Sequence, residues 1–222
     1  MKIDKKEVLR YLGYKGQILD EKTENLIDQS IKDIQNRAEI RSIHRFFPLA
    51  AEGKRLLIEG AEIHLAGEDI RRHLKNSSHC IIIAATLGHE VDRFIRYYER
   101  LDMTKALILD ASASVAIEGV IDKLNQDLKH QVALDHKALT SRYSPGYGDF
   151  SLNIQSSILD ILGAKKTIGL TTNFHNILIP RKSITAVLGI VEDGIEINKN
   201  SCDNCNIRDN CSFSKGGKGC GY

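Results

Sequence analysis

Neither a strong net charge nor a long apolar run occurs in this sequence of 222 residues. Its 31 basic and 29 acidic side chains leave a formal net charge of +2, too weak a field to recruit nucleic acid or an acidic membrane. The longest apolar run, IIIAA at 81–85, is far too short to span a bilayer. The N-terminus, MKIDKKEVLR, lacks the apolar segment of a secretory signal. We therefore expect a cytoplasmic protein that binds neither nucleic acid nor membrane.

Motifs of self-contained enzymes are also missing. The sequence has no nucleophile elbow, no P-loop and no His-Glu-x-x-His zinc helix. Gly146 and Gly148 form G-x-G, but Ser151 stands where a dinucleotide fingerprint has its third glycine, and no apolar strand immediately precedes. These absences disfavour a hydrolase, a kinase or a dinucleotide-binding enzyme.

The composition is that of an ordinary folded domain, with 42% hydrophobic and 27% charged residues. A chain of this length can bury one full core, alone or with a small appendage. We assign residues 1–198 to one domain, in which 1–50 form an N-terminal helical region. Residues 199–222 form a Cys-rich tail.

Apolar periodicity and capping residues predict the secondary structure. Asp69 is a possible helix cap within 52–74, Ser151 caps a later helix, and Gly163 ends it. Helices are expected at 4–12, 27–38, 52–74, 89–100, 102–130 (the longest) and 151–162, and strands at 79–86, 165–172 and 183–191. Because strands and helices do not alternate regularly, the pattern favours an α+β fold over a doubly wound sheet.

The segment RYSPGYGDF, residues 142–150, concentrates groups that suit a ligand. Arg142 offers a planar fork of donors for a carboxylate, Pro145 stiffens the turn, and Gly146 leaves the backbone open. Tyr147 offers a ring face to a base or a cation. S-adenosylmethionine carries a carboxylate, a positive centre and a flat heterocycle. The alternative is a tight surface turn with no ligand.

This segment, with the following amphipathic helix, KKTIGLT and IPRKSITAVLGI, resembles the activation (reactivation) domain of cobalamin-dependent methionine synthase. VLRYLGYKGQ, near the N-terminus, resembles stand-alone forms of that domain, and the likeness covers residues 1 to about 195. The resemblance implies a twisted antiparallel sheet flanked by helices and a site for S-adenosylmethionine. It also implies docking over oxidised cobalamin, which an electron donor reduces before methylation.

The resemblance assigns candidate site residues. Arg142, Ser144, Gly146 and Tyr147 match the S-adenosylmethionine loop, with Pro145 inside it, and Glu118 matches an acidic residue of the same pocket. A carboxylate at Glu118 could accept from the ligand's amino group; alternatively it is a solvated acid on a helix face. TNFH stands at 172–175 where the family often has Leu-Thr-Glu-Ser, so the role of that glutamate does not transfer.

Four of the five cysteines lie in the tail, as Cys202, Cys205, Cys211 and Cys220, with the spacing C-x2-C-x5-C-x8-C. Closely spaced thiolates in a cytoplasmic chain suit zinc or an iron–sulfur cluster. A reactive or disulfide-forming tail and an inert tail are the alternatives. The fifth cysteine, Cys80, falls in an apolar strand and is predicted to be a small core residue.

Two hypotheses follow. In the first, the chain binds S-adenosylmethionine and supports reductive methylation of cobalamin in a separate methionine synthase, as an accessory component that does not turn over alone. No catalytic acid or base is then required, because cobalt is the nucleophile. In the second, it is a metal-containing regulatory or electron-transfer module that acts on another corrinoid protein.

Overall fold

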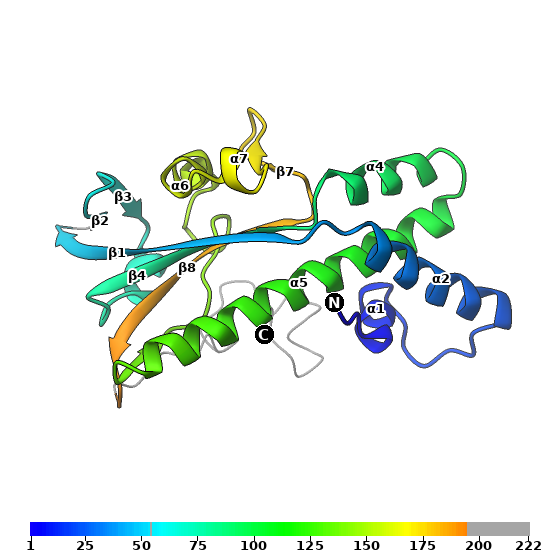
Figure 1. Ribbon diagram of the computed structural model, residues 1–222, viewed down its shortest axis with the longest axis horizontal. Coiled ribbons are helices and arrows are strands. Elements are labelled where there is room, and N and C mark those ends of the chain that lie inside the picture. Colours follow the sequence, from blue (N-terminus) through cyan, green and yellow to red (C-terminus); the bar gives the residue numbers. More distant parts are fainter. Residues whose placement is uncertain (54, 195–222) are drawn as a thin grey trace. The chain divides into compact units, whose positions relative to one another are not determined.

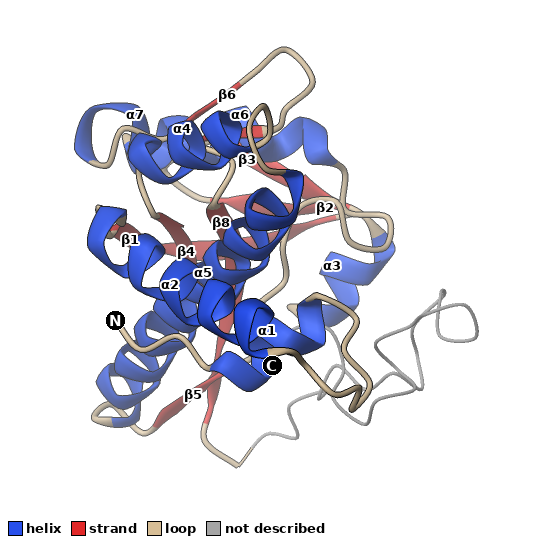
Figure 2. Cartoon of the chain, turned by 90° about the vertical axis from the view of Figure 1, so that its right-hand side faces the viewer, coloured by secondary structure: helices blue, strands red, loops and turns tan. Residues whose placement is uncertain are grey.

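Helices and strands are mixed along the chain, as the cartoon coloured by secondary structure shows (Figure 2). The computed structural model describes residues 1–53 and 55–194. The helices are α1 (Lys5–Tyr11), α2 (Glu21–Arg37), α3 (Glu68–His73), α4 (His89–Tyr98), α5 (Met103–Ala133), α6 (Gln155–Leu162) and α7 (Ala164–Thr167), with a short 3-10 turn, η1 (Leu152–Ile154). The strands are β1 (Arg41–Glu52), β2 (Arg55–Ile58), β3 (Ile63–Ala66), β4 (His79–Thr86), β5 (Lys137–Leu139), β6 (Thr171–Thr172), β7 (Leu178–Ile179) and β8 (Ser183–Glu192).

Six of these strands form one antiparallel sheet, which is flanked by helices. Its order is β3-β2-β1-β4-β8-β5, and β6 and β7 pair separately. The register is fixed by pairs such as Leu49 with Ile58, Leu56 with Leu65, and Leu139 with Ile190. This arrangement confirms the α+β class with an antiparallel sheet and flanking helices. The Cys-rich tail lies outside the described residues.

The chain forms two compact units, each built from three stretches of sequence. Of the described residues, the first comprises 1–42, 85–124 and 165–184, and the second comprises 43–84, 125–164 and 185–194. The first unit contains α1, α2, α4, most of α5 and most of α7. The second contains α3, α6 and the main part of the six-stranded sheet.

In the first unit, side-chain caps start the N-terminal helices. The Asp4 carboxylate accepts from the backbone N–H of Lys6, and Asp20 caps α2 in the same way. Helices α1 and α2 lie side by side (Figure 1), and Lys5 Nζ is 2.8 Å from Asp28 Oδ1. Ile27 and Ile34 lie two turns apart on the same face of α2, and both are buried.

In the second unit, the central strands are buried on both faces. Every residue of β4 from Cys80 onward is buried, as are residues 185–191 of β8. Helix α6 is tied to the sheet, since Gln155 Nε2 donates to Thr185 Oγ1 at 2.7 Å. Arg45 in β1 donates to the carbonyl of Ile161 at 2.6 Å. A strand covered on both sides reads as a continuous apolar run.

Three predicted segments are wrong. The range 52–74 forms a strand hairpin, β2 and β3, before the short helix α3, where Gly67 is the cap and Asp69 lies in the first turn. The N-terminal helical region ends at Arg37, and β1 occupies 41–52. The expected strand at 165–172 is the helix α7 followed by only two strand residues.

Long periodic elements and local caps are confirmed. Helix α5 has 31 residues and is the longest described helix. Ser151 accepts from the N–H of Asn153 to start η1, and Gly163 ends α6 in the left-handed conformation. Among the described residues, none of the helices has the length and apolar content needed to cross a membrane.

Candidate ligand-binding loop

The loop 142–150 begins beside the sheet and then closes on itself. Tyr143 and Val187 of β8 exchange two backbone hydrogen bonds of 2.9 Å each. Farther along, Gly146 N–H donates to the Phe150 carbonyl at 2.7 Å, and Phe150 N–H donates to the Tyr147 carbonyl at 3.0 Å. Because the backbone groups bond within the loop, its shape does not depend on a ligand.

Two glycines permit this shape. Gly146 has φ +95° and Gly148 has φ +53°, both in the region that side chains other than hydrogen disfavour. A Cβ on Gly148 would collide with the Asp69 carboxylate and would lie 2.7 Å from the Tyr143 hydroxyl. A Cβ on Gly146 would meet the Leu152 side chain at 3.1 Å. The loop therefore needs glycine at 148 for space as well as for conformation.

Asp149 fastens the loop to helix α3. Its carboxylate accepts from the backbone N–H groups of Glu68, at 2.6 Å, and Asp69, at 3.1 Å. Gly67 at the N-cap has no side chain to satisfy these donors, so Asp149 caps the helix from about 80 positions away in sequence. In return, the Asp69 carboxylate accepts from Asp149 N–H at 3.3 Å. Asp149 is not identified by the sequence analysis, because the N–H groups that it accepts from lie about 80 positions away in the sequence.

Aromatic packing supports the base of the loop. The Tyr143 ring lies 5.1 Å from the His73 ring and 6.1 Å from the buried Phe150 ring, measured between centroids. His73 is itself buried, and its Nε2 lies 2.8 Å from the Ser141 carbonyl and 3.0 Å from Thr140 Oγ1. These ring contacts and hydrogen bonds support the base of the loop.

The predicted loop residues differ in exposure. Arg142 and Ser144 are half-buried, Pro145 is buried, and Gly146 and Tyr147 are exposed. Tyr147 keeps 55% of its surface accessible although its neighbours in the loop are fixed. The buried proline supports the turn, whereas the tyrosine ring and the glycine backbone face solvent, where a ligand could reach them.

Glu118 belongs to the first unit, whereas the loop 142–150 belongs to the second. It lies on α5, is half-buried, and acts electrostatically on Tyr11 of α1. Burial, and after it the negative charge of Glu118, raise the pKa of the Tyr11 phenol. Glu118 is therefore more than a fully solvated acid on a helix face, and its role toward a ligand stays a prediction.

The predicted metal ligands Cys202, Cys205, Cys211 and Cys220 lie outside the described residues. Within the part of the chain that the structure describes, no cluster of three His, Cys, Asp or Glu side chains could hold a metal ion. Cys80 is fully buried in β4, which confirms its prediction as a core residue.

Burial raises the pKa of the Cys80 thiol from 9.0 to about 12. Because the thiolate is the reactive form, iodoacetamide at about pH 8 should modify at most four of the five cysteines in the native chain. Intact-mass analysis counts the modified cysteines. Rapid modification of all five without denaturant would contradict this prediction.

The raised pKa of Cys80 also makes stability depend on pH. In the pH range from about 9 to about 12 the unfolded thiol ionises while the native thiol stays protonated, so the free energy of unfolding should fall as pH rises.

No family model and no curated protein sequence matches the chain. Among solved structures, it is similar to the crystal structure of the MetH reactivation domain bound to AdoHcy, with a TM-score of 0.63 and 14% sequence identity. The similarity covers 97% of this chain and 82% of that one. The resemblance seen in the sequence is thereby supported at the level of the fold.

Proposed function

We propose that this chain binds S-adenosylmethionine and supports reductive methylation of cobalamin held by a separate methionine synthase. The proposal rests mainly on one observation: a loop with the sequence RYSPGYGDF is held in a fixed shape on a fold similar to the MetH reactivation domain. The solved neighbour contains AdoHcy, which is the demethylated form of the proposed ligand.

The loop offers complementary groups for each part of such a ligand. Arg142 can pair with the carboxylate through two parallel N–H donors, and the exposed Tyr147 ring can stack on the adenine. At Gly146 the missing side chain lets the ligand approach the backbone, while Ser144 and Pro145 shape the turn. Because the loop is already fixed, little conformational entropy would be lost on binding.

Glu118 is proposed to help through charge, by accepting from the ligand's amino group or by offsetting its sulfonium. When bound, S-adenosylmethionine supplies the methyl group, and the cobalamin of the partner protein supplies the nucleophilic cobalt. This chain contributes positioning, so it is an accessory component that should not turn over alone. The partners are then a cobalamin-binding methionine synthase, or a related corrinoid protein, and an electron donor.

Calorimetric titration of S-adenosylmethionine into the purified chain tests the proposal. Arg142→Ala should weaken saturable binding by at least about tenfold, since it removes the bidentate contact to the carboxylate. Arg93→Ala is the matched control, because Arg93 is an exposed arginine of α4 that, among the described residues, pairs with Glu90. Binding that is absent, or that is unchanged by Arg142→Ala, would leave the loop as a surface turn.

The cysteine spacing favours a second candidate, a metal-containing regulatory or electron-transfer module that acts on another corrinoid protein. Anaerobic purification followed by metal analysis distinguishes a redox metal site from a structural one. Bound iron with absorbance near about 400 nm would support a redox role, and stoichiometric zinc would support a structural one. A chain that binds S-adenosylmethionine and no metal would support the first candidate alone.

A further inference from the structure

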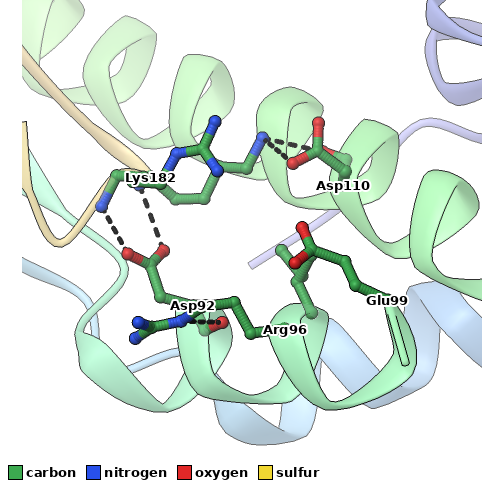
Figure 3. Close-up of a pocket in the computed structure, with 7 residues that line it drawn as sticks. Asp92, Arg96, Glu99, Asp110 and Lys182 are labelled. Carbon is green, nitrogen blue, oxygen red and sulfur yellow. Dashed lines mark hydrogen bonds and ion pairs between the residues drawn. The ribbon is translucent and has the colours of Figure 1, made fainter. Parts of the chain in front are cut away.

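A second polar site lies in the first unit, where α4, α5 and the segment after Pro180 line a hollow that is open to solvent (Figure 3). The buried Asp92 carboxylate shapes it by accepting from the backbone N–H groups of Arg181, at 2.5 Å, and Lys182, at 3.4 Å. Asp92 is only 7% exposed, so its two oxygens are committed to this backbone. The segment 181–182 is thereby held against α4.

The lysine of this segment is fully engaged. Lys182 Nζ lies 2.8 Å from Asp110 Oδ1 and also donates to the Asp110 carbonyl, at 3.1 Å, and to Ser114 Oγ, at 2.8 Å. Its three donors are thus satisfied, and its side chain is only 13% exposed. Lys182 and Asp110 neutralise each other on one wall of the hollow.

Arg96 and Arg181 differ from Lys182 in how few of their donors are satisfied. Within residues 1–53 and 55–194, the guanidinium groups of Arg96 and Arg181 form no ion pair. The only side-chain hydrogen bond of Arg96 among these residues is from Nε to the Asp92 carbonyl, at 3.4 Å. Each guanidinium has five donors in a planar fork. Most of the donors of these two guanidinium groups therefore have no acceptor among the described residues.

Glu99 is the one remaining carboxylate that lines the hollow, and it forms no ion pair with a described residue. In Figure 3 its carboxylate and the Arg96 guanidinium lie on different sides of the hollow. The six charged side chains of the lining sum to zero, so attraction of an anion would come from aligned donors rather than from a strong field.

The surface beside the hollow is apolar. Leu107 lies one helical turn before Asp110 on α5 and is 59% exposed, and Met103, one turn earlier, is 57% exposed. Ile95 lines the hollow itself. An anionic group in the hollow could therefore belong to a molecule whose apolar part covers these side chains.

We propose that this hollow binds the oxyanion group of a small organic molecule, a carboxylate or a phosphate, between Arg96 and Arg181. The site is independent of the loop 142–150 and of the proposed role in methylation. Asp92 and Lys182 are positioning residues, because they fix the backbone and the wall, whereas the two guanidinium groups contact the ligand.

Phenyl phosphate and benzoate are the probes, titrated separately into ¹⁵N-labelled protein while the arginine Nε–H signals are followed by NMR. We expect saturable shifts at Arg96 and Arg181, with binding weakened about tenfold by Arg181→Gln. The probe that binds more tightly identifies the source as phosphate or carboxylate. Arg181 is exposed, so this substitution should leave the fold intact.

Two further variants test the geometry. Glu99→Gln should tighten binding, because Glu99 is the one lining carboxylate without a cationic or backbone partner among the described residues. Arg100→Gln, two positions beyond the end of α4 and outside the lining, should have no effect. Shifts that stay linear up to about 10 mM, or that respond equally to Arg100→Gln, would overturn the proposal. Because Arg142 and S-adenosylmethionine are not involved, either proposal can fail without the other.

Discussion

Replacing Gly148 with alanine should abolish saturable binding of S-adenosylmethionine and lower the melting temperature. The added methyl group would collide with the Asp69 carboxylate and lie 2.7 Å from the Tyr143 hydroxyl, at a residue with φ +53°. Relief requires moving the carboxylate that accepts from Asp149 N–H, or the ring that packs on His73. We expect a cost of about 1–3 kcal/mol and a displaced loop, measured by thermal unfolding and by the same calorimetric titration.

Gly53→Ala is the matched control for this substitution. Gly53 has φ +57°, almost the same as Gly148, but a Cβ there would have no atom within 4 Å. It therefore reports the conformational strain alone, about 1 kcal/mol, without the collision. The control should bind S-adenosylmethionine normally. Binding by Gly148→Ala that stays within about threefold of the unsubstituted chain would show that the fixed loop shape is not needed.

How far the sequence predicts this fold depends on whether the signal is local. The long helix α5 and the buried strand β4 were predicted because their apolar patterns extend over many residues. Ser151 and Gly163 mark the ends of the next helical segment for equally local reasons, a side-chain acceptor and a left-handed conformation.

The hairpin β2–β3 occupies a segment for which the residue pattern predicts helix, because strand pairing and not local sequence determines its structure. Residues 55–58 contain only a few alternating buried positions, and two adjacent leucines obscure the period of two. The strand exists because it pairs with β1 on one side and with β3 on the other. Tertiary pairing of this kind overrides the weak propensity of a four-residue segment.

The candidate loop shows the same division. Its ligand-suited residues, Arg142 and Tyr147, could be identified from chemistry and from the family resemblance. The residue that fastens it, Asp149, could not, because its partners are the N–H groups of Glu68 and Asp69. A helix start without its own capping side chain, at Gly67, was the only indication that a distant acceptor is required.

Replacing Asp92 with alanine should destabilise the chain by about 2–4 kcal/mol. The substitution removes the acceptor for two backbone N–H groups, those of Arg181 and Lys182, at a position that is 7% exposed. Those part-buried donors would then lose the acceptor that now satisfies both of them, which costs more than the loss of an average hydrogen bond. Urea denaturation gives the free energy of unfolding of each variant.

Two substitutions separate this role from a general effect of charge. Asp92→Asn keeps an amide oxygen that can accept one of the two N–H groups, so about half of the loss should be recovered. Asp110→Ala removes a nearby carboxylate that is about half exposed and pairs with Lys182, and it should cost less than about 1 kcal/mol. If Asp110→Ala were as destabilising as Asp92→Ala, electrostatic balance around Lys182 would be the cause. We instead expect Asp92→Ala to have a lower free energy of unfolding than Asp92→Asn and Asp110→Ala. The reason is that only the Asp92 carboxylate satisfies both backbone donors together.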